Sequence, residues 1–394
     1  MVWFLLLTLL FFLFFSYLPL LKLFYMINNT ICCVLNYAPH YRLSIYLKIQ
    51  EHLNCHFYFG SKLQTNIKKI DYSKLYNVNE LKSIWFFNKV YVMVGLLNLL
   101  FKPYKKYLIT GQTNCLSNWI FIPLARLMGK EVYIWNHGWY GKETYFKKII
   151  KKFFYIPVSG FFLYGEYAKN LMIKEGFKEN KLKVVYNSLD FEKTKKIRKT
   201  IHKTNLIENY FSNKQPTIIF IGRLQKNKKL EMLITFLKEQ QLKGQIYNLI
   251  LIGDGNNKFE LLRQVHCLQL EKQVWFFGAC YDEYKIAELI FNADVCVSPG
   301  NVGLTAIHAL SYGTPVITNN DFSHQMPEFE AIIPNLTGDF FIKDSIQSMN
   351  ESIENWIKLY PRKTEDLIKN CYTIIDEKYN IFYQIKIFKE TLLN

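Results

Sequence analysis

Three short stretches in the second half of the chain carry residue types that hold phosphate groups. In "IGRLQKNKK", Arg223 places a guanidinium at a strand end and Lys228 adds an ammonium five residues later. The other two are the glycine turn "IGDG" and the uncharged turn "SPGNVGLT", which precedes an apolar, helix-like segment. A helix start offers unpaired N–H groups and the positive end of the helix dipole. Since guanidinium, ammonium and helix start all attract anions, the three stretches together predict a diphosphate site.

Each of these features also has an ordinary structural explanation. Glycine turns follow strands in every α/β protein, so "IGDG" or Arg223 alone is equally compatible with a plain turn. What favours a binding site is that all three stretches follow successive predicted strands. The carboxyl ends of parallel strands form one edge of a sheet, where such folds bind ligands.

The elements around these stretches predict an α/β fold. Apolar strands such as Thr30–Leu35 and Cys55–Gly60 alternate with helices, which is typical of βαβ units and a parallel sheet. After a polar, basic stretch the alternation restarts at "PTIIFIGRL", with a helix expected from Lys229 to about Gln241. The sequence therefore predicts two Rossmann-like domains facing across a cleft, with a C-terminal closing helix.

The expected boundaries are a hydrophobic segment at 1–25, a first domain at 26–205, a second at 206–378 and the closing helix at 379–394. Residues 1–21 carry no charge, and about 20 apolar residues suffice to cross a bilayer. One interpretation is a membrane anchor, with Lys22 and the basic half on the cytoplasmic side. Alternatively, translation starts at Met26, or the segment is a buried helix.

The positive charge of the chain is confined to its first half. The net charge is +17, and residues 27–200 hold 28 Lys and Arg against 10 Asp and Glu. Residues 201–394 hold 20 against 22. The first half should therefore be attracted to an anionic partner, whether membrane phosphate, nucleic acid or an acidic ligand.

The eight cysteines form no C-x-x-C pair, and several lie in apolar runs. This pattern predicts buried, reduced thiols and no zinc site.

The second half resembles the donor domain of the family 4 glycosyltransferases. The similarity lies in "FIGRLQKNKKLEMLI", "LILIGDGNNKFELL", "VWFFGACYDEYKIAELIFNADVCVSPG" and "GLTAIHALSYGTPVIT". In the first half, "NYAPHYRLSIY" is similar to the family's first loop, and "VVYNSLD" to its strand-Asn-x-x-Asp. The resemblance covers nearly everything from about Asn28 onward. It implies the GT-B architecture and a retaining transfer of sugar from a nucleotide-diphosphate-sugar to a saccharide acceptor, with no cofactor and no metal.

The resemblance also implies roles for residues at the strand ends of the second half. Arg223 and Lys228 would neutralise the donor diphosphate, and the amides from Gly303 onward would cap it. The residues expected to bind the donor are Gly222, Arg223, Lys228, Gly255, Gly300, Asn301, Gly303, Leu304, Thr305 and His308.

The chain departs from the family pattern at two of these positions. The family often carries two glutamates eight residues apart, one holding the donor sugar and one the ribose. Gly300 and His308 stand at those places. Asn301 could contact sugar hydroxyls and His308 a ribose hydroxyl, or His308 could simply pack beside Leu304. The departure puts the donor sugar, and the activity itself, in question.

In the first half, "YIWNHGWYGKE" places His137 where the chain leaves a strand. By the resemblance, His137 would orient the donor sugar at its reacting carbon, because the departing diphosphate oxygen takes the acceptor proton itself. The expected catalytic residues are thus His137, Arg223 and Lys228. His40 and Arg42 could contact acceptor or diphosphate. His137 as a structural loop residue and His40 as a surface residue stay open alternatives.

The expected setting is surface polysaccharide assembly, such as lipopolysaccharide or capsule, at the cytoplasmic face of the membrane. The chain would be peripheral there, or anchored if residues 1–21 are translated. A lipid-linked acceptor would suit the basic, aromatic-rich first half. Three alternatives are a nucleotide-sugar epimerase, an inactive scaffold and a nucleic-acid-binding protein. The first needs cleft carboxylates, of which the sequence identified none, and the last has no recognised motif, so no nucleic-acid partner is expected.

Overall fold

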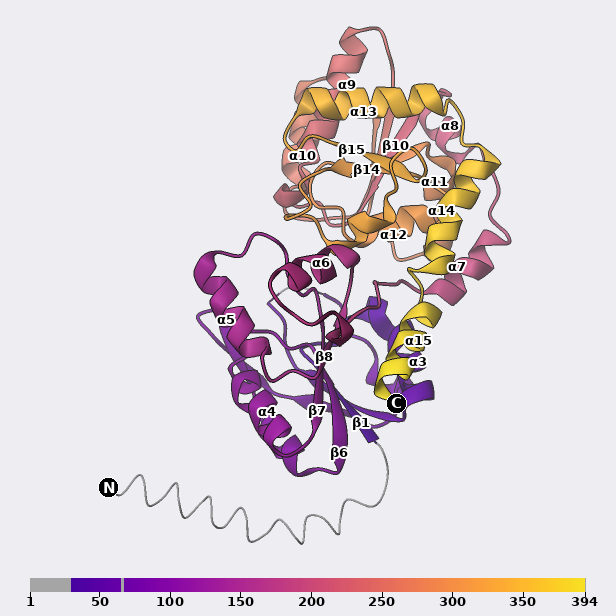
Figure 1. The fold of residues 1–394 in the computed structure, drawn as a ribbon. Coiled ribbons are helices and arrows are strands. Elements are labelled where there is room, and N and C mark those ends of the chain that lie inside the picture. Colours follow the sequence, from indigo (N-terminus) through magenta and orange to yellow (C-terminus); the bar gives the residue numbers. More distant parts are fainter. Residues whose placement is uncertain (1–29, 65–66, 394) are drawn as a thin grey trace, which may run out of the picture.

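The computed structural model describes residues 30–64 and 67–393, which form two α/β halves stacked one above the other (Figure 1). The predicted hydrophobic segment at 1–25 lies outside these residues. Each half is built on a parallel sheet. The predicted α/β class with two Rossmann-like units is confirmed.

The first half contains a seven-stranded sheet in the order β3-β2-β1-β6-β7-β8-β9, and every neighbouring pair in it is parallel. Its strands are β1 (Thr30–Leu35), β2 (Cys55–Gly60), β3 (Val78–Leu81), β6 (Tyr104–Ile109), β7 (Glu131–Asn136), β8 (Gly160–Leu163) and β9 (Leu182–Val184). An antiparallel hairpin of β4 (Ser83–Phe86) and β5 (Val90–Met93) lies outside this sheet and was not predicted.

Helices cover both faces of the first sheet. They are η2 (His40–Arg42), α3 (Leu43–Leu53), η3 (Tyr72–Lys74), η4 (Leu96–Phe101), α4 (Leu116–Leu127), α5 (Tyr145–Tyr155), α6 (Glu166–Lys174) and η5 (Glu179–Lys181). In Figure 1, α4 and α5 lie together along one side of this half, whereas α3 lies on the other. The next helix, α7 (Phe191–Arg198), lies beside α14 (Glu365–Glu377) of the second half, where Arg198 donates to Asp376 and to the Ser311 carbonyl.

The second half contains a six-stranded parallel sheet in the order β12-β11-β10-β13-β14-β15. Its strands are β10 (Thr217–Ile221), β11 (Asn248–Ile252), β12 (Val274–Gly278), β13 (Val295–Ser298), β14 (Val316–Asn319) and β15 (Gly338–Phe341). This is the strand order of a dinucleotide-binding sheet: successive strands are added toward one edge up to the third strand, and from the fourth strand they are added toward the other edge. The reversal places the ends of β10 and β13 side by side.

The elements that surround this sheet are η6 (Lys226–Lys228), α8 (Leu206–Phe211), α9 (Glu231–Leu242), α10 (Lys258–Cys267), α11 (Glu283–Asn292), α12 (Leu304–Ser311), η7 (Pro327–Ala331), α13 (Ile346–Leu359) and α14 (Glu365–Glu377). Strand β11 is buried on both faces, as the continuous apolar run "NLILI" predicts. The α9 helix begins two residues later than expected.

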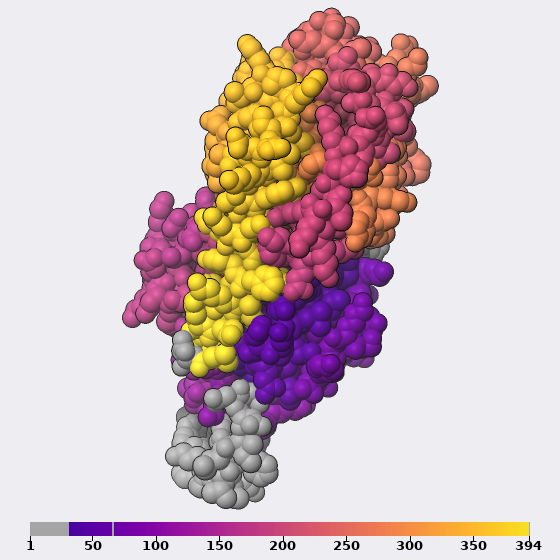
Figure 2. All heavy atoms as spheres, turned by 90° about the vertical axis from the view of Figure 1, so that its right-hand side faces the viewer, coloured from indigo at the N-terminus to yellow at the C-terminus, as the bar shows by residue number. Residues whose placement is uncertain are grey.

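The last helix, α15 (Ile381–Leu392), returns to the first half, as predicted for a closing helix. Its N-cap residue Asn380 accepts hydrogen bonds from two backbone N–H groups of the first turn, which defines where the helix starts. Phe388 then packs its ring against Trp135 and Phe162 of the first half. Figure 2 shows this C-terminal segment running from the second half down onto the first. The two halves are therefore joined by packing as well as by the chain.

Six of the eight cysteines are buried, as expected, whereas Cys267 is exposed and Cys280 is half-buried. All eight are free thiols. Within residues 30–64 and 67–393, none of the helices combines the length and the hydropathy that crossing a bilayer requires.

Candidate functional site

The turns after β10 and β11 pack against each other backbone to backbone. Gly222 N–H donates to the Ile252 carbonyl at 2.9 Å, and Leu224 N–H donates to the Asp254 carbonyl at 2.9 Å. A Cβ at Gly253 would lie 1.9 Å from the Gly222 oxygen, and one at Gly255 would lie 2.3 Å from the Leu224 oxygen. The glycines of "IGDG" are therefore required by loop packing, and a contact of Gly255 with the donor stays a prediction.

The turn after β13 is held equally closely by the loop that carries Lys228. Gly300 N–H donates to the Lys228 carbonyl at 2.9 Å. A Cβ at Gly300 would lie 2.0 Å from the Asn227 oxygen and 2.7 Å from the Lys228 Cα. A glutamate cannot stand at position 300 unless this loop moves. The close packing of these two loops therefore explains why position 300 carries glycine instead of the glutamate of the family pattern.

Two buried amides fix the same turn from the other side. Asn319 donates to the Gly300 carbonyl at 2.9 Å, and the Gln325 side-chain oxygen accepts the Val302 N–H at 2.8 Å. The side-chain oxygen of Asn301 is buried and finds no hydrogen-bond partner in the described part of the chain. A polar atom in that state is suited to receiving a hydrogen bond from a ligand.

Lys228 lies in η6 rather than in the first turn of the next helix, which begins only at Glu231. Its ammonium donates to the Asn301 carbonyl at 2.6 Å, so it points at the turn after β13. Burial and, to a smaller extent, the nearby positive charge of Arg223 lower the pKa of Lys228 to about 8. Arg223 itself is exposed. Two cations therefore lie near the switch point of the second sheet.

The start of α12 completes this side of the site. Its N-cap residue Gly303 has φ 56° and ψ −150°, a backbone conformation that side-chain-bearing residues rarely adopt. Thr305 donates its hydroxyl to the Ile221 carbonyl at 2.7 Å, which ties α12 to the end of β10. Leu304 is half-buried. The first N–H groups of α12 thereby lie beside the loop of Arg223 and Lys228.

His308 is held by a carboxylate that comes from another helix. Its Nε2–H donates to Glu283 Oε1 at 2.8 Å, and the Tyr312 hydroxyl donates to the same oxygen at 2.7 Å. Burial raises the pKa of Glu283, but these hydrogen bonds outweigh burial and leave the pKa below its usual value. His308 thus brings a charged carboxylate to the place where the family carries its second glutamate.

In the first half, Arg42 is fixed among aromatic rings. It donates to the Tyr164 hydroxyl at 2.6 Å, and its guanidinium lies 5.0 Å from the centre of the Trp135 ring. Its Nε is buried, with no acceptor among the described residues. His40 lies two residues away but is exposed, with its backbone N–H bound to the Lys68 carbonyl. The structure therefore places Arg42 in the interior, whereas His40 lies on the surface.

His137 lies directly after β7, in a pocket between the halves that also includes Tyr140 and Pro327. Its ring centre is 4.9 Å from that of Tyr164, the tyrosine that holds Arg42. Burial lowers the pKa of His137 to about 3, and the positive charges of Arg42 and Lys151 add to this effect. The imidazole is neutral near pH 7, so it can hold a hydroxyl but cannot donate a proton as an imidazolium. Its Nδ1 is buried and unpaired among the residues described.

The sequence reasoning identified no carboxylate for the cleft and missed a buried carboxylate of η7. Glu328 in η7 is 2% exposed, and its Oε1 accepts a hydrogen bond from Asn187 at 2.8 Å. Its Oε2 has no partner among the described residues. Burial raises the pKa of Glu328, whereas Asn187 and the charges of Arg42 and Lys228 lower it. One signal in the sequence is a glutamate set between apolar neighbours, in "MPEF" after a strand.

A second carboxylate of η7 joins the two halves directly. The oxygens of Glu330 accept the backbone N–H groups of Glu166 at 2.7 Å and Tyr167 at 2.8 Å, at the start of α6. Burial raises the pKa of Glu330 to about 7, although these two N–H groups act in the opposite direction. A Cβ at Gly165 would lie 2.2 Å from Glu330 Oε1, so this contact needs a glycine.

Comparison with known proteins now identifies part of the chain. Residues 202–373 match the model of the family "Glycosyl transferases group 1". We call these residues the group 1 domain, after the family model that they match. A curated relative of the chain comes from Klebsiella pneumoniae and is described as "Uncharacterized 41.2 kDa protein in cps region". It is 29% identical over 238 residues, which are 59% of this chain and 57% of that protein.

Solved structures resemble the chain over both halves. The apo form of the lipopolysaccharide outer core galactosyltransferase WaaB has a TM-score of 0.67 at 16% identity. HepE from Anabaena, solved in complex with UDP, has a TM-score of 0.70 at 15% identity. Both alignments cover 92% of this chain and 99% of the other. They confirm the GT-B fold around the group 1 domain.

Proposed function

We propose that the protein is a retaining glycosyltransferase that moves a sugar from a nucleotide-diphosphate-sugar to a saccharide acceptor. The observation that carries the proposal is the placement of Lys228 at the turn before α12. It lies at the switch point of the second sheet, and the charges of both Lys228 and Arg42 act on the buried Glu328. Membership of residues 202–373 in the group 1 family supports sugar transfer.

In this proposal the donor diphosphate binds to Arg223, Lys228 and the first N–H groups of α12. Two positive side chains and a helix N-terminus supply the neutralisation that a metal gives in other enzymes, so the transfer is expected to need no metal. UDP is the first nucleotide to test, because the related Anabaena structures hold UDP and UDP-glucose.

The role of His137 follows from its neutral state. A neutral imidazole can hold a hydroxyl of the donor sugar and fix its reacting carbon in line with the acceptor. The departing diphosphate oxygen then takes the proton of the acceptor hydroxyl, and the new bond forms on the same face. Lys228 and Arg223 stabilise the charge that develops on the leaving group.

Glu328 supplies the sugar-binding carboxylate that position 300 cannot carry. Its Oε1 is occupied by Asn187, whereas its Oε2 is free to accept a hydroxyl of the donor sugar. A buried, unpaired carboxylate oxygen is costly, and a ligand hydroxyl would relieve that cost. Arg42 would contact the same sugar or the acceptor.

The acceptor is proposed to be a lipid-linked saccharide, used at the cytoplasmic face of the membrane in surface polysaccharide assembly. The excess of positive charge in residues 27–200 supports an anionic membrane partner. The relative from a cps region and the lipopolysaccharide enzyme among the similar structures support the setting. The domain boundaries at 26–205 and 206–378 remain predictions.

The first experiment is a thermal-shift screen of the full chain with UDP, GDP and ADP and with sugars of each. One nucleotide should raise the melting temperature, and Arg223→Ala should remove the response because it deletes a diphosphate ligand. Arg263→Ala is the matched control, since Arg263 is 69% exposed in the same half and pairs only with Glu260 among the described acidic residues. An unchanged response in Arg223→Ala would show that the diphosphate binds elsewhere.

A further inference from the structure

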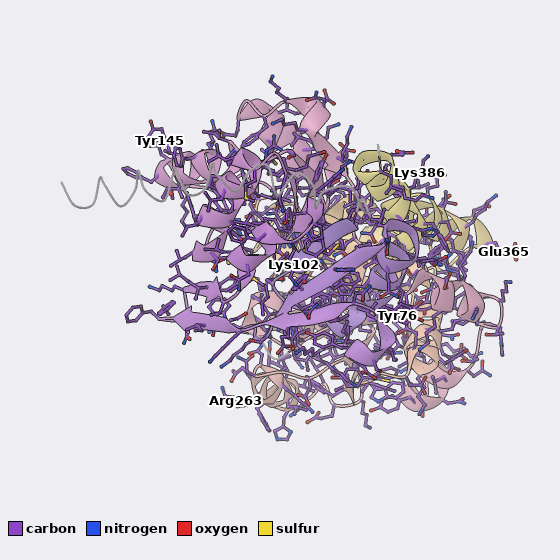
Figure 3. The ribbon with its side chains drawn as sticks, turned by 90° about the horizontal axis from the view of Figure 1, so that it is seen from below. Tyr76, Lys102, Tyr145, Arg263, Glu365 and Lys386 are labelled. Atoms are coloured by element: carbon purple, nitrogen blue, oxygen red, sulfur yellow. The ribbon has the colours of Figure 1, made fainter. Side chains whose placement is uncertain are left out.

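Helix α5 presents its large apolar side chains to the outside. Phe146 is 76% exposed, Phe153 is 69% exposed and Ile156, just after the helix, is 71% exposed. Tyr145, Ile149 and Ile150 are exposed as well. Figure 3 shows Tyr145 at the edge of the molecule, on the side opposite Lys386 of α15. A surface helix of a water-exposed protein normally turns such residues inward.

The ion pairs of the α5 lysines explain why the helix is oriented with these apolar side chains exposed. Lys148 and Lys152 bind the two carboxylate oxygens of Glu175 at 2.5 and 2.7 Å. Lys151 binds Glu143 at 2.7 Å and lies 4.5 Å from the centre of the Trp139 ring. Three of the four lysines in "KKIIKK" are therefore paired with carboxylates of the protein. These ion pairs, together with the buried Phe154 and Tyr155, fix the helix so that Tyr145, Phe146, Ile149, Ile150 and Phe153 lie outside.

Helix α4 extends the same apolar surface. Leu127 is 82% exposed and Ile120 is 52% exposed. Between the two helices lies a groove of about 320 Å³, lined by Trp119, Pro123 and Phe153 among others. Contiguous apolar surface of this kind marks an interaction site. We call the exposed apolar residues of α4 and α5, with Ile156, the α4–α5 face.

We propose that the α4–α5 face lies on an anionic lipid bilayer, with its aromatic and aliphatic side chains in the headgroup region. Charge decides between a bilayer and other occupants. Lys142 and Lys147 are exposed next to the apolar residues, and the half that carries them has 28 basic against 10 acidic residues. Apolar side chains combined with lysines are the pattern of helices that bind in the plane of an anionic membrane.

The position of α5 connects this face with the site. Only the residues from His137 to Thr144 separate β7 from α5, and Glu143 in this loop accepts the N–H groups of Tyr140 and Gly141. A bilayer bound to α5 would thus lie one short, ordered loop away from His137. If the proposed function holds, this places the saccharide of a lipid-linked acceptor within reach of the donor.

The test measures hydrogen exchange in residues 145–156 of the full chain with and without vesicles. Vesicles of phosphatidylglycerol and phosphatidylethanolamine should protect these residues, whereas phosphatidylcholine vesicles should protect them much less. This local readout is needed because residues 1–21 could bind lipid on their own. Protection that is equal on both lipids, or that appears without vesicles as protein concentration rises, would overturn the proposal.

A triple variant gives the second measurement. Phe146→Ser, Phe153→Ser and Ile156→Ser together should reduce the exchange protection that anionic vesicles give to residues 145–156 about tenfold or more, because three inserted apolar side chains are lost. The matched control is Leu242→Ser, Phe259→Ser and Ile342→Ser, which removes three exposed apolar residues of the second half. Both variants should keep the rise in melting temperature with nucleotide. A failure of the bilayer proposal is therefore distinguishable from a failure of the proposed function. Equal protection of residues 145–156 by anionic vesicles in the two variants would contradict the proposal that the α4–α5 face lies on the bilayer.

Discussion

The two halves share one architecture but build their strand-end loops in opposite ways. In the second half, the loops touch through backbone, and glycines stand where a Cβ would collide. In the first half, the loops carry Arg42, His137 and Tyr164, whose side chains lie against one another. The loops after β10, β11 and β13 of the second half thus form a closely packed group, which we call the backbone frame. The first half faces the proposed ligand of this frame with side chains instead.

The two regions also differ in how far their polar atoms are satisfied. The backbone groups of Gly300 and Val302 and the hydroxyl of Thr305 in the second half are hydrogen-bonded, and among the side chains of this turn only Asn301 Oδ1 is buried without a described partner. In the residues described, by contrast, Arg42 Nε and His137 Nδ1 are buried without partners. Loops whose backbone groups are already hydrogen-bonded can be rigid before a ligand binds. Buried side chains without hydrogen-bond partners can gain those partners from the ligand. Glu328 has one oxygen of each kind, since Oε1 accepts a hydrogen bond from Asn187 and Oε2 has no partner among the described residues.

The substitution expected to disrupt the packing between the loops after β10 and β11 most strongly is Gly253→Ala. A Cβ there would lie 1.9 Å from a backbone oxygen, and the residue has φ +142°. Crowding and backbone strain together should lower the free energy of unfolding by about 3 kcal/mol, measured by urea denaturation. Gly244→Ala is the control, because Gly244 has φ +76° but no atom within 4 Å of the added Cβ. Equal losses in the two variants would show that contact between the loops contributes nothing.

The carboxylate between the regions is tested by Glu328→Gln. The substitution keeps the shape and the bond to Asn187 possible, but it removes the negative oxygen proposed to bind the donor sugar. Turnover should fall about 100-fold while UDP still raises the melting temperature. Glu330→Gln alters the neighbouring carboxylate, which binds the start of α6, and should affect stability more than turnover. If both variants lose turnover equally, Glu328 is a structural residue.

The smallest expected effect concerns the charge of Lys228. Its pKa of about 8 in the free protein means that the ammonium is lost as pH rises from 7 to 9. A bound diphosphate favours the ammonium and raises this pKa, so nucleotide binding should take up protons and weaken about tenfold over that range. Titration calorimetry in buffers of different ionisation enthalpy measures the uptake. Lys228→Arg keeps its charge at both pH values and should show little of this pH dependence.

Local patterns in the sequence predicted the backbone frame well. The strands "PTIIFIGRL" and "YNLILIGDG" are short apolar runs that end in glycine, and such runs specify both a buried parallel strand and the turn that follows. Arg223 and Lys228 follow β10 and Gly303 follows β13, so the order of the strands places them at one edge. The hairpin β4–β5 was not predicted, because its short, half-exposed strands lack a buried apolar run.

The sequence by itself determined the elements, their α/β alternation and the residue types proposed to bind phosphate, because each depends on neighbours within a few positions. Only the tertiary structure decided the partners of the long side chains. Asn187 meets Glu328 across 141 residues, and Glu166 meets Glu330 across 164. The ion pairs that turn the lysines of α5 inward likewise join separate segments, such as Lys148 and Glu175. Burial and charge at such sites arise from packing between distant segments, which no local pattern encodes.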